Sequence, residues 1–216
     1  MAEQSSTEET TGAARVLDLA ELLRGRRSVR RLRPDPVQRA LVEQVLEAGR
    51  WAPSPHGSQP WRFAVLTEPS ARARLADAMA DSWQHNLAMD GQDAETIAKR
   101  LAGSRRRLLE APVLIMVSLY LEDLDHYPDP ERQAAETTMA IQSLGACVQN
   151  MLLMAYRLGL DAGWMCAPLF CPEVARDAIG LPDGELPQAL LPLGYAAADP
   201  KRRPRRPLES LITVWE

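Results

Sequence analysis

Apolar residues along the chain follow two kinds of pattern. Segments in which they are continuous or alternate with polar residues predict the strands. Pro112 to Tyr120 is a continuous apolar run, which is typical of a strand buried on both faces of a sheet. Trp61 to Leu66 alternates and is rich in aromatic and β-branched residues, so we expect a second strand there. Two further segments complete the predicted sheet, Leu160–Cys166 and Leu190–Ala196.

Apolar residues at helical spacing, with Asp or Pro at the starts, predict the helices. These are Asp18–Arg24, a helix from Asp35-Pro36 to Gly49, one that starts at Pro69-Ser70, Asp93–Glu110, Ala134–Leu158 and Pro172–Ile179. The helix from Ala134 to Leu158 is apolar on more than one face, so we expect it to be buried within a subunit or shared between subunits. Strands and helices interleave without a linker or repeat, which predicts one α+β or α/β domain over residues 17–216. Residues 1–16 are polar and acidic, and we expect a disordered tail.

Composition excludes several classes of protein. Of the 216 residues, 46% are hydrophobic and 25% are charged, and the net charge of −4 provides no basic field that would recruit nucleic acid. No apolar run approaches the length of a membrane span, and the polar N-terminus does not resemble a secretory signal. Three cysteines at irregular spacing argue against disulfides and indicate a cytoplasmic protein, and scattered histidines give no metal-binding pattern.

Two neighbouring segments carry the candidate chemistry. Arg26-Arg27-Ser28-Val29-Arg30 places three guanidiniums and a hydroxyl at the end of a short helix, where like charges repel unless they bind an anion such as phosphate. The loop from Trp51 to Trp61 combines prolines and small polar residues between tryptophans, which suits a flat aromatic ligand. Together they predict a phosphorylated ring cofactor. Taken alone, the arginines could equally be a solvated helix end that interacts with the helix dipole.

These segments resemble the flavin-dependent nitroreductase superfamily. The likeness rests on Arg-Arg-Ser-Val-Arg, on Ala-Pro-Ser followed after five residues by Pro-Trp-Arg-Phe, on Leu193-Gly194-Tyr195, and on the basic arm that ends at Arg206-Pro207-Leu208-Glu209. The resemblance implies an α+β fold, with a mixed sheet surrounded by helices, in an intertwined homodimer. It also implies FMN as the cofactor, bound between the two subunits.

The resemblance assigns roles to individual residues. The FMN phosphate and ribityl chain would lie against Arg26, Ser28 and Arg30, with Arg27 beside them and Arg203 and Arg205 closing from the C-terminal arm. A loop of the partner subunit would reach the flavin through Pro53, Ser54, Pro55, His56 and Gly57, although family members often have asparagine where this chain has Gly57. Met165, Cys166 and Ala167 would lie beside the reactive edge of the ring, where backbone N–H groups tune a flavin. A catalytic side chain is not implied.

Two of these assignments have simpler alternatives. Trp83 and Asn86 would lie near the substrate, but an interface helix with one buried tryptophan explains them equally well. The basic run around Arg203 and Arg205 is also typical of a solvated tail or an RNA-binding segment, although the net negative charge argues against RNA.

A narrower likeness concerns the C-terminal reductase domain of the bifunctional γ-glutamyl ligase that completes the deazaflavin coenzyme F-420. It rests on Ala-Pro-Ser-Pro-His, Glu95–Arg100, Arg132 with Ala135-Glu136, and Gly145–Asn150. It implies reduction of a dehydro precursor of that coenzyme. The alternatives are a nitro- or quinone-reducing enzyme with a nicotinamide donor, a flavin-fragmenting enzyme of cobalamin synthesis, which lacks support in the loop pattern, and a non-catalytic flavin or deazaflavin binding protein.

Overall fold

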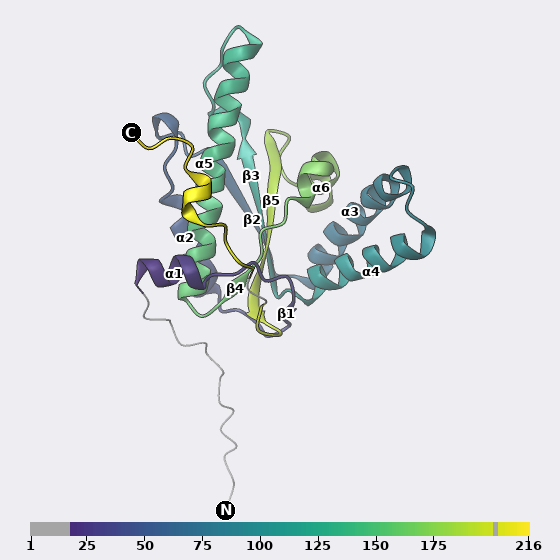
Figure 1. The fold of residues 1–216 in the computed structure, drawn as a ribbon. Helices are drawn as coiled ribbons and strands as arrows, with labels where there is room; N and C mark the ends of the chain where they lie inside the picture. Colours follow the sequence, from purple (N-terminus) through teal and green to yellow (C-terminus); the bar gives the residue numbers. More distant parts are fainter. Residues whose placement is uncertain (1–17, 201–202) are drawn as a thin grey trace, which may run out of the picture.

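A computed structural model describes residues 18–200 and 203–216, so the predicted tail at residues 1–16 lies outside the described residues. The chain forms a five-stranded sheet with helices on both faces (Figure 1). Its strands are β1 (Leu32–Arg33), β2 (Trp61–Leu66), β3 (Val113–Tyr120), β4 (Asp161–Ala162) and β5 (Glu185–Ala196). They lie in the order β1-β5-β3-β2, with β4 also paired to β5. The α+β class is confirmed.

The strands pair antiparallel, which corrects the expectation of a mixed sheet. Among the described residues, parallel pairing is limited to an isolated bridge between Ser28 and Ala162. The order of strands depends on pairings between segments that are distant in the sequence. A connection long enough to contain a helix, such as those before and after β3, can join strands that pair either parallel or antiparallel. The lengths of the connections therefore could not decide the orientation.

The central strand β3 is buried on both faces, as its apolar run predicts. Val113, Ile115, Val117 and Leu119 belong to one core, which α2 (Arg39–Arg50) and α5 (Pro130–Arg157) cover. Leu114 and Met116 of the same strand belong to a second core, under α3 (Pro69–Met89), α4 (Ala94–Glu110) and α6 (Pro172–Ile179). Alternation of side chains along a strand thus fills two cores from one segment.

Capping residues explain where the helices begin. Asp18 caps α1 (Leu19–Gly25) and Asp93 caps α4, each accepting a hydrogen bond from a backbone N–H of the first turn. Asp129 caps α5 in the same way, so this helix begins at Pro130, four residues before the predicted start. Asp35 instead forms an ion pair with Arg33 at 3.1 Å, and α2 begins only at Arg39.

Helices α3 and α4 form a hairpin on one face of the sheet, and a buried arginine ties its two arms together. Arg72 of α3, which is 8% exposed, donates from Nη1 to the carbonyl oxygens of Leu109 and Ala111 at the end of α4. Burial lowers the pKa of this guanidinium. The contact satisfies carbonyls that have no partner within the helix.

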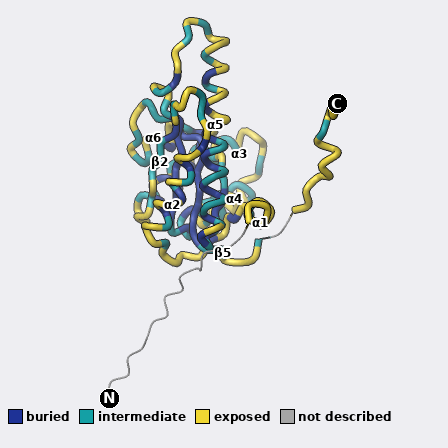
Figure 2. The backbone as a smooth tube through the Cα atoms, turned by 90° about the vertical axis from the view of Figure 1, so that its left-hand side faces the viewer, coloured by how far each residue is buried: buried dark blue, intermediate teal, exposed yellow. Residues whose placement is uncertain are grey.

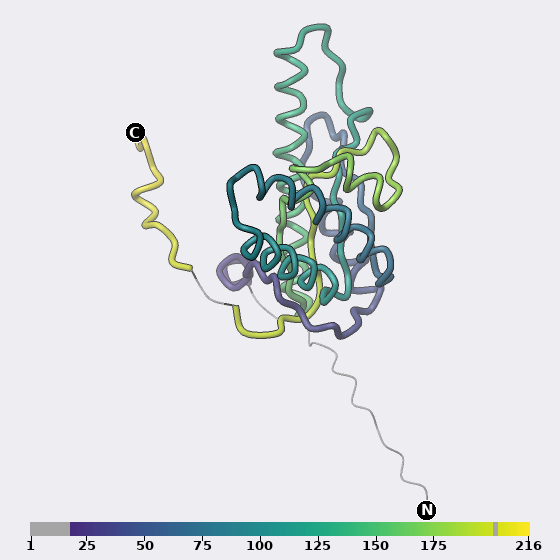
Figure 3. Tube along the Cα trace, turned by 90° about the vertical axis from the view of Figure 1, so that its right-hand side faces the viewer, coloured from purple at the N-terminus to yellow at the C-terminus, as the bar shows by residue number. Residues whose placement is uncertain are grey.

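The last described residues leave the body of the protein. After β5 the chain continues to a short 3₁₀ turn at Leu208–Leu211 that stands away from the sheet and helices (Figures 2 and 3). Leu208, Leu211, Val214 and Trp215 are each more than 60% exposed there. Across the described parts of the chain, none of the helices has the length and apolar character needed to cross a membrane.

Candidate functional site

The arginine segment is fixed by a close backbone contact with the turn after β4. The Val29 N–H donates to the Ala162 carbonyl at 2.9 Å, next to the bridge between Ser28 and Ala162. The following residue is Gly163, and a Cβ atom on it would lie 2.5 Å from the Val29 carbonyl oxygen. The absence of a side chain at Gly163 therefore lets Arg26–Arg30 lie directly beside the segment that begins at Trp164.

The charge of Arg205, on the C-terminal arm, acts on the guanidinium of Arg26. Burial lowers the pKa of the Arg26 guanidinium, and the positive charges of Arg205 and Arg27 lower it further. The Nε atom of Arg26 is buried and has no hydrogen-bond partner among the described residues. An arginine near a second one, with an unsatisfied donor, can bind an anion. Arg203 of the same arm is exposed, and Arg202 lies outside the described residues.

Arg27 has a different environment from the one predicted. Its Nη1 donates to the carbonyl oxygens of Arg24 and Arg26, at 2.5 Å and 2.8 Å. The guanidinium thereby satisfies carbonyls at the C-terminal end of α1. Its expected place beside the phosphate gains no support from this geometry.

Arg30 and Met165–Ala167 line one cavity of about 450 Å³, whose other side is formed by the α3–α4 hairpin. Trp83 and Asn86 of α3 line the same cavity, whereas His85, which lies between them in the sequence, is exposed and is not part of the lining. The structure therefore brings the predicted substrate residues and the predicted ring-contacting residues to the same place.

The backbone N–H groups near the cavity differ in whether they already donate a hydrogen bond. The Met165 N–H donates to the Leu190 carbonyl at 3.0 Å, and this hydrogen bond anchors the segment to β5. No hydrogen bond within the described residues uses the N–H of Cys166 or Ala167. Of the three residues predicted to tune a ring, two can therefore donate to a ligand, and Met165 contributes its side chain. The Cys166 side chain is exposed at the cavity, as expected for a lining residue.

Two further polar atoms near the cavity are buried and have no hydrogen-bond partner among the described residues, and the second belongs to a residue that sequence reasoning missed. One is Nε1 of Trp164, and the other is Nε of Arg107 on α4. Arg107 belongs to the run Arg105-Arg106-Arg107, which a sequence reading assigns to a charged helix face. Only the rotation of α4 against α3 shows which of the three side chains faces inward.

Within one chain, the predicted flavin loop lies far from the arginine segment. Strand pairing places Trp61, just after the loop, opposite Leu119, whereas Ala162 beside Ser28 aligns through β5 with Val113. The two positions are about 20 Å apart along β3 at ~3.4 Å per residue. Figures 1 and 3 show the loop between α2 and β2 at the upper end of the sheet and β1 at the lower end. Pro53–Gly57 and Arg26–Arg30 of one chain therefore do not meet.

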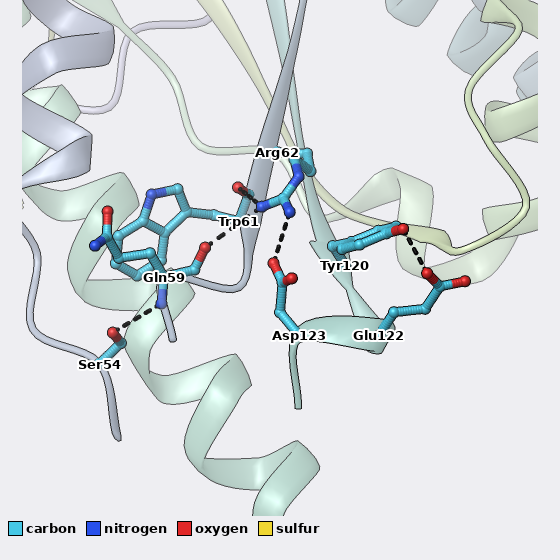
Figure 4. Close-up of polar contacts among 7 residues, drawn as sticks. All are labelled: Ser54, Gln59, Trp61, Arg62, Tyr120, Glu122 and Asp123. Carbon is cyan, nitrogen blue, oxygen red and sulfur yellow. Dashed lines mark hydrogen bonds and ion pairs between the residues drawn. The ribbon is translucent and has the colours of Figure 1, made fainter. Parts of the chain in front are cut away.

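The loop itself has a constrained backbone. His56 and Gly57 have φ values of 54° and 69°, and Gln59 has 48°. The Gln59 N–H donates to Oγ of Ser54 at 3.0 Å and closes the loop (Figure 4). Non-glycine residues rarely adopt positive φ, and such residues are frequent where a loop presents its backbone to a ligand.

Comparison with known proteins identifies the family. The model of the nitroreductase family matches residues 23–195. This chain belongs to the nitroreductase family. A protein named NADH dehydrogenase from Thermus thermophilus is 31% identical over 223 residues, covering 93% of this chain and 97% of that protein. A putative NAD(P)H nitroreductase from Bacillus subtilis, YfhC, is 25% identical over 195 residues, covering 90% and 93%.

A solved structure has the same fold. A putative nitroreductase from Desulfovibrio desulfuricans in complex with FMN superposes with a TM-score of 0.68 and 27% identity, covering 91% of this chain and 96% of that one. The named relatives are oxidoreductases, so the chain belongs to a family of redox enzymes.

This nitroreductase family member has a second cavity, of about 600 Å³, at the outer edge of β2. The guanidinium of Arg62 in this cavity already has partners within the protein. Arg62 donates to Asp123 at 2.6 Å and to the Trp61 carbonyl at 3.0 Å, and it stacks 4.5 Å from the centre of the Tyr120 ring (Figure 4). The Tyr120 hydroxyl donates to Glu122, and this bond raises the pKa of Tyr120. The network braces the 3₁₀ turn Leu121–Asp123 against β2, and we favour the first cavity as the site.

Proposed function

We propose that the chain is an FMN-dependent oxidoreductase that accepts electrons from a nicotinamide nucleotide and passes them to a small aromatic acceptor. The observation that carries the proposal is the cavity between Arg30 and Met165–Ala167, next to the coupled pair Arg26 and Arg205. The relatives named NADH dehydrogenase and NAD(P)H nitroreductase, and the FMN complex of the structural neighbour, support the same cofactor and donor.

The unsatisfied polar atoms fit FMN. A phosphate at Arg26 and Arg205 would accept hydrogen bonds from the buried Nε of Arg26 and relieve the repulsion between the two guanidiniums. A five-carbon ribityl chain separates the phosphate of FMN from its ring, which places the ring in the adjacent cavity. The N–H groups of Cys166 and Ala167 would then meet its polar edge.

FMN supplies hydride transfer, which moves two electrons at a time between a donor and an acceptor. The protein's part is to hold donor and acceptor in turn against one face of the ring and to exclude water with Trp83 and Trp164. Backbone N–H groups adjust the electron affinity of the ring through fixed dipoles. No side chain is assigned as the proton donor.

The proposal includes a homodimer. Trp61, which follows the loop Pro53–Gly57, lies about 20 Å along the sheet from the position of Ala162 beside Ser28, so a role at the flavin requires the loop of a second copy. The C-terminal arm exposes Leu208, Leu211, Val214 and Trp215 away from its own domain. A second copy that covers these side chains would hold Arg205 at the phosphate and bring the loop to the ring.

Reduction of a dehydro precursor of coenzyme F-420 is the narrower form of this proposal. It rests on the motifs at Glu95–Arg100 and Gly145–Asn150 alone. A protein that retains a deazaflavin tightly and turns over the dehydro precursor, but not nitroaromatics, would support it over the nicotinamide-dependent reaction.

The test begins with the purified protein. We expect a yellow protein that co-purifies with about one FMN per chain, identified by mass spectrometry, and whose colour is bleached by NADH or NADPH without oxygen. A colourless protein that shows no change in flavin fluorescence on titration with FMN would refute the cofactor assignment. Bound flavin that neither nicotinamide reduces, but that dithionite does, would refute the donor and favour a non-catalytic flavin binding protein.

A further inference from the structure

The arginines of the site form two separate pairs rather than one cluster. The charge of Arg205 acts on Arg26, whereas the charge of Arg30 acts on Arg107. Arg26 and Arg30 lie on either side of Ser28, about 13 Å apart if the segment is extended at ~3.3 Å per residue. Of these four residues, Arg30 and Arg107 line the cavity, and Arg26 and Arg205 do not. Arg107 lies with Arg30 at the cavity, apart from Arg26 and Arg205, so its guanidinium is available to a second anion.

Arg107 is prepared for that anion by its surroundings on α4. Its Nε is buried and has no hydrogen-bond partner, and no ion pair within the described residues neutralises it. Arg105 of the same helix also lines the cavity, but it is bound by Asp77 through two contacts, at 2.6 Å and 3.3 Å. Burial lowers the pKa of Arg107, as expected when a charge is held out of water without a counter-ion.

The guanidinium of Arg107 lies over the preceding turn of its own helix. A Cβ atom on Gly103 would lie 3.8 Å from Nη1 of Arg107, which is an ordinary contact. Among the described residues that line the cavity, Asp90 is the one acidic residue, and it forms no ion pair with Arg30 or Arg107. The cavity therefore keeps an excess of positive charge.

Aromatic and apolar side chains form much of the remaining wall, which also contains Ser82, Asn86 and Ser104. Trp83, Trp164 and Phe170 line the cavity together with Met79 and Met165. Phe170 is 74% exposed, which places an aromatic ring at the rim. Aromatic walls favour a flat ring, and a guanidinium favours a planar carboxylate that it can bind with two parallel hydrogen bonds.

We infer that the acceptor is an aromatic acid, and that Arg107 selects it by binding its carboxylate while the ring lies between the tryptophans and the flavin position. This inference rests on the proposed function and names the substrate class of the same site. Arg107 comes from the α3–α4 hairpin, as do Trp83 and Asn86, whereas the residues assigned to the cofactor come from the opposite wall. This separation assigns Arg107 to the substrate and not to FMN.

The test compares two acceptors that differ only in charge, 4-nitrobenzoate and 4-nitrobenzamide, on the FMN-loaded protein. With NADH as donor, two electrons and two protons, one carried with the hydride and one from solvent, convert the nitro group to a nitroso group and water. Equilibrium binding to the oxidised protein, followed by tryptophan fluorescence, gives the Kd of each compound. We expect wild-type protein to bind the benzoate at least tenfold more tightly.

The informative variant is Arg107→Gln, with Arg106→Gln as the control. Arg106 lies on the same helix with an exposed side chain, 3.9 Å from Glu110. We expect Arg107→Gln to raise the Kd of 4-nitrobenzoate about tenfold to a hundredfold, the effect of losing a charge-assisted pair. In Arg107→Gln, the Kd of 4-nitrobenzamide and the FMN content should stay within twofold of the wild-type values. In Arg106→Gln, the Kd of both compounds and the FMN content should stay within twofold.

Three results would overturn the inference. Equal weakening of both compounds would show that Arg107 shapes the cavity without reading charge. Loss of FMN from both Arg107→Gln and the conservative Arg107→Lys would assign Arg107 to the cofactor. Wild-type protein that reduces 4-nitrobenzamide with NADH but shows no preference for the benzoate would leave the proposed function standing and refute the substrate class. Absence of FMN or of any NADH-dependent turnover would instead refute the proposed function.

Discussion

The carbonyl oxygen of Val29 lies 2.5 Å from the point where a Cβ atom on Gly163 would stand. Real Cβ atoms do not approach an oxygen so closely, so Gly163→Ala must displace the backbone of one segment or the other. We expect the variant to lose about 1–3 kcal/mol of the free energy of unfolding, as overpacked sites do, measured by urea denaturation. Because Arg26 and Arg30 would move with the displaced segment, FMN should also bind about tenfold more weakly or worse.

The matched control is Gly145→Ala, because its Cβ would meet only Cη2 of Trp164 at 3.7 Å, an ordinary contact. Within helix α5 this substitution should be neutral or stabilising by up to ~1 kcal/mol. Unchanged stability and unchanged FMN affinity in Gly163→Ala would show that the contact between the arginine segment and β4 does not organise the site.

Much of the fold was predictable because its strands and helices have strong local patterns. Trp61–Leu66 and Pro172–Ile179 have the predicted bounds, and the predicted strand at Pro112–Tyr120 begins one residue later. The predicted bounds differ from the observed ones where a tertiary contact or a capping residue determines where an element begins. Strand β5 begins at Glu185 rather than Leu190, because it pairs with β3 across a register shift at Val117 and Ser118.

The candidate site was only partly predictable, because an arginine looks the same in sequence whatever it contacts. Five adjacent residues contain Arg26, which is coupled to the C-terminal arm, Arg27, which binds the end of its own helix, and Arg30, which lines the cavity. Arg107 was hidden in a run of three arginines whose roles depend on how α4 packs on α3. Local pattern predicts that a segment is basic, and tertiary packing decides which guanidinium is left without a partner.

Substitution of Arg205 should leave the stability of the FMN-free protein unchanged or higher, but should weaken the binding of FMN. In the absence of FMN, Arg205→Gln removes a like charge near Arg26, so stability should stay the same or rise. With FMN present, loss of a charge-assisted hydrogen bond of ~1.5–3 kcal/mol should raise the Kd of FMN about tenfold to a hundredfold. Thermal unfolding with and without excess FMN measures both effects, since bound ligand adds stability according to its affinity.

Arg206→Gln is the control for this experiment, because Arg206 is the exposed residue next in the arm. We expect it to leave both melting temperatures unchanged. If Arg205→Gln lowers stability without FMN and leaves the affinity for FMN intact, the arm does not reach the phosphate, and the convergence of the two chain ends at one anion is wrong.

Truncation of the exposed arm should separate the proposed dimer. A chain that ends before Leu208 lacks the exposed apolar side chains Leu208, Leu211, Val214 and Trp215, which a second copy would cover in the proposed dimer. We expect light scattering to show a dimer for the full chain and a monomer for the truncated one. The monomer should bind FMN weakly, because the loop at Pro53–Gly57 would no longer reach the neighbouring site.

Two substitutions separate this effect from a simple loss of folding. Glu209→Gln changes an exposed polar residue of the arm and should leave the dimer intact. His56→Ala alters the loop without touching the arm, so it should keep the dimer and weaken FMN binding. A full-length chain that is monomeric and still saturates with FMN would refute both the dimer and the role of the loop.

The three cysteines should respond differently to alkali, because burial raises the pKa of Cys147 to about 12 and also raises that of Cys171, whereas Cys166 is exposed. In the unfolded chain a cysteine ionises near pH 8.5. Between about pH 9 and pH 12 the unfolded state therefore binds fewer protons at Cys147 than the folded state, and stability must fall as the pH rises. Below that window the buried thiol is neutral in both states and does not make stability depend on pH.

We expect Cys147→Ala to lower stability at neutral pH, since it leaves a cavity, but to flatten the decline of stability from pH 9 to pH 11, measured by urea denaturation. Below pH 8, iodoacetamide should modify Cys166 alone in the native protein, and bound FMN should slow that modification. A decline with pH that is equally steep in Cys147→Ala, or alkylation of Cys147 without unfolding, would show that this thiol is not held in the core that joins α2 to α5.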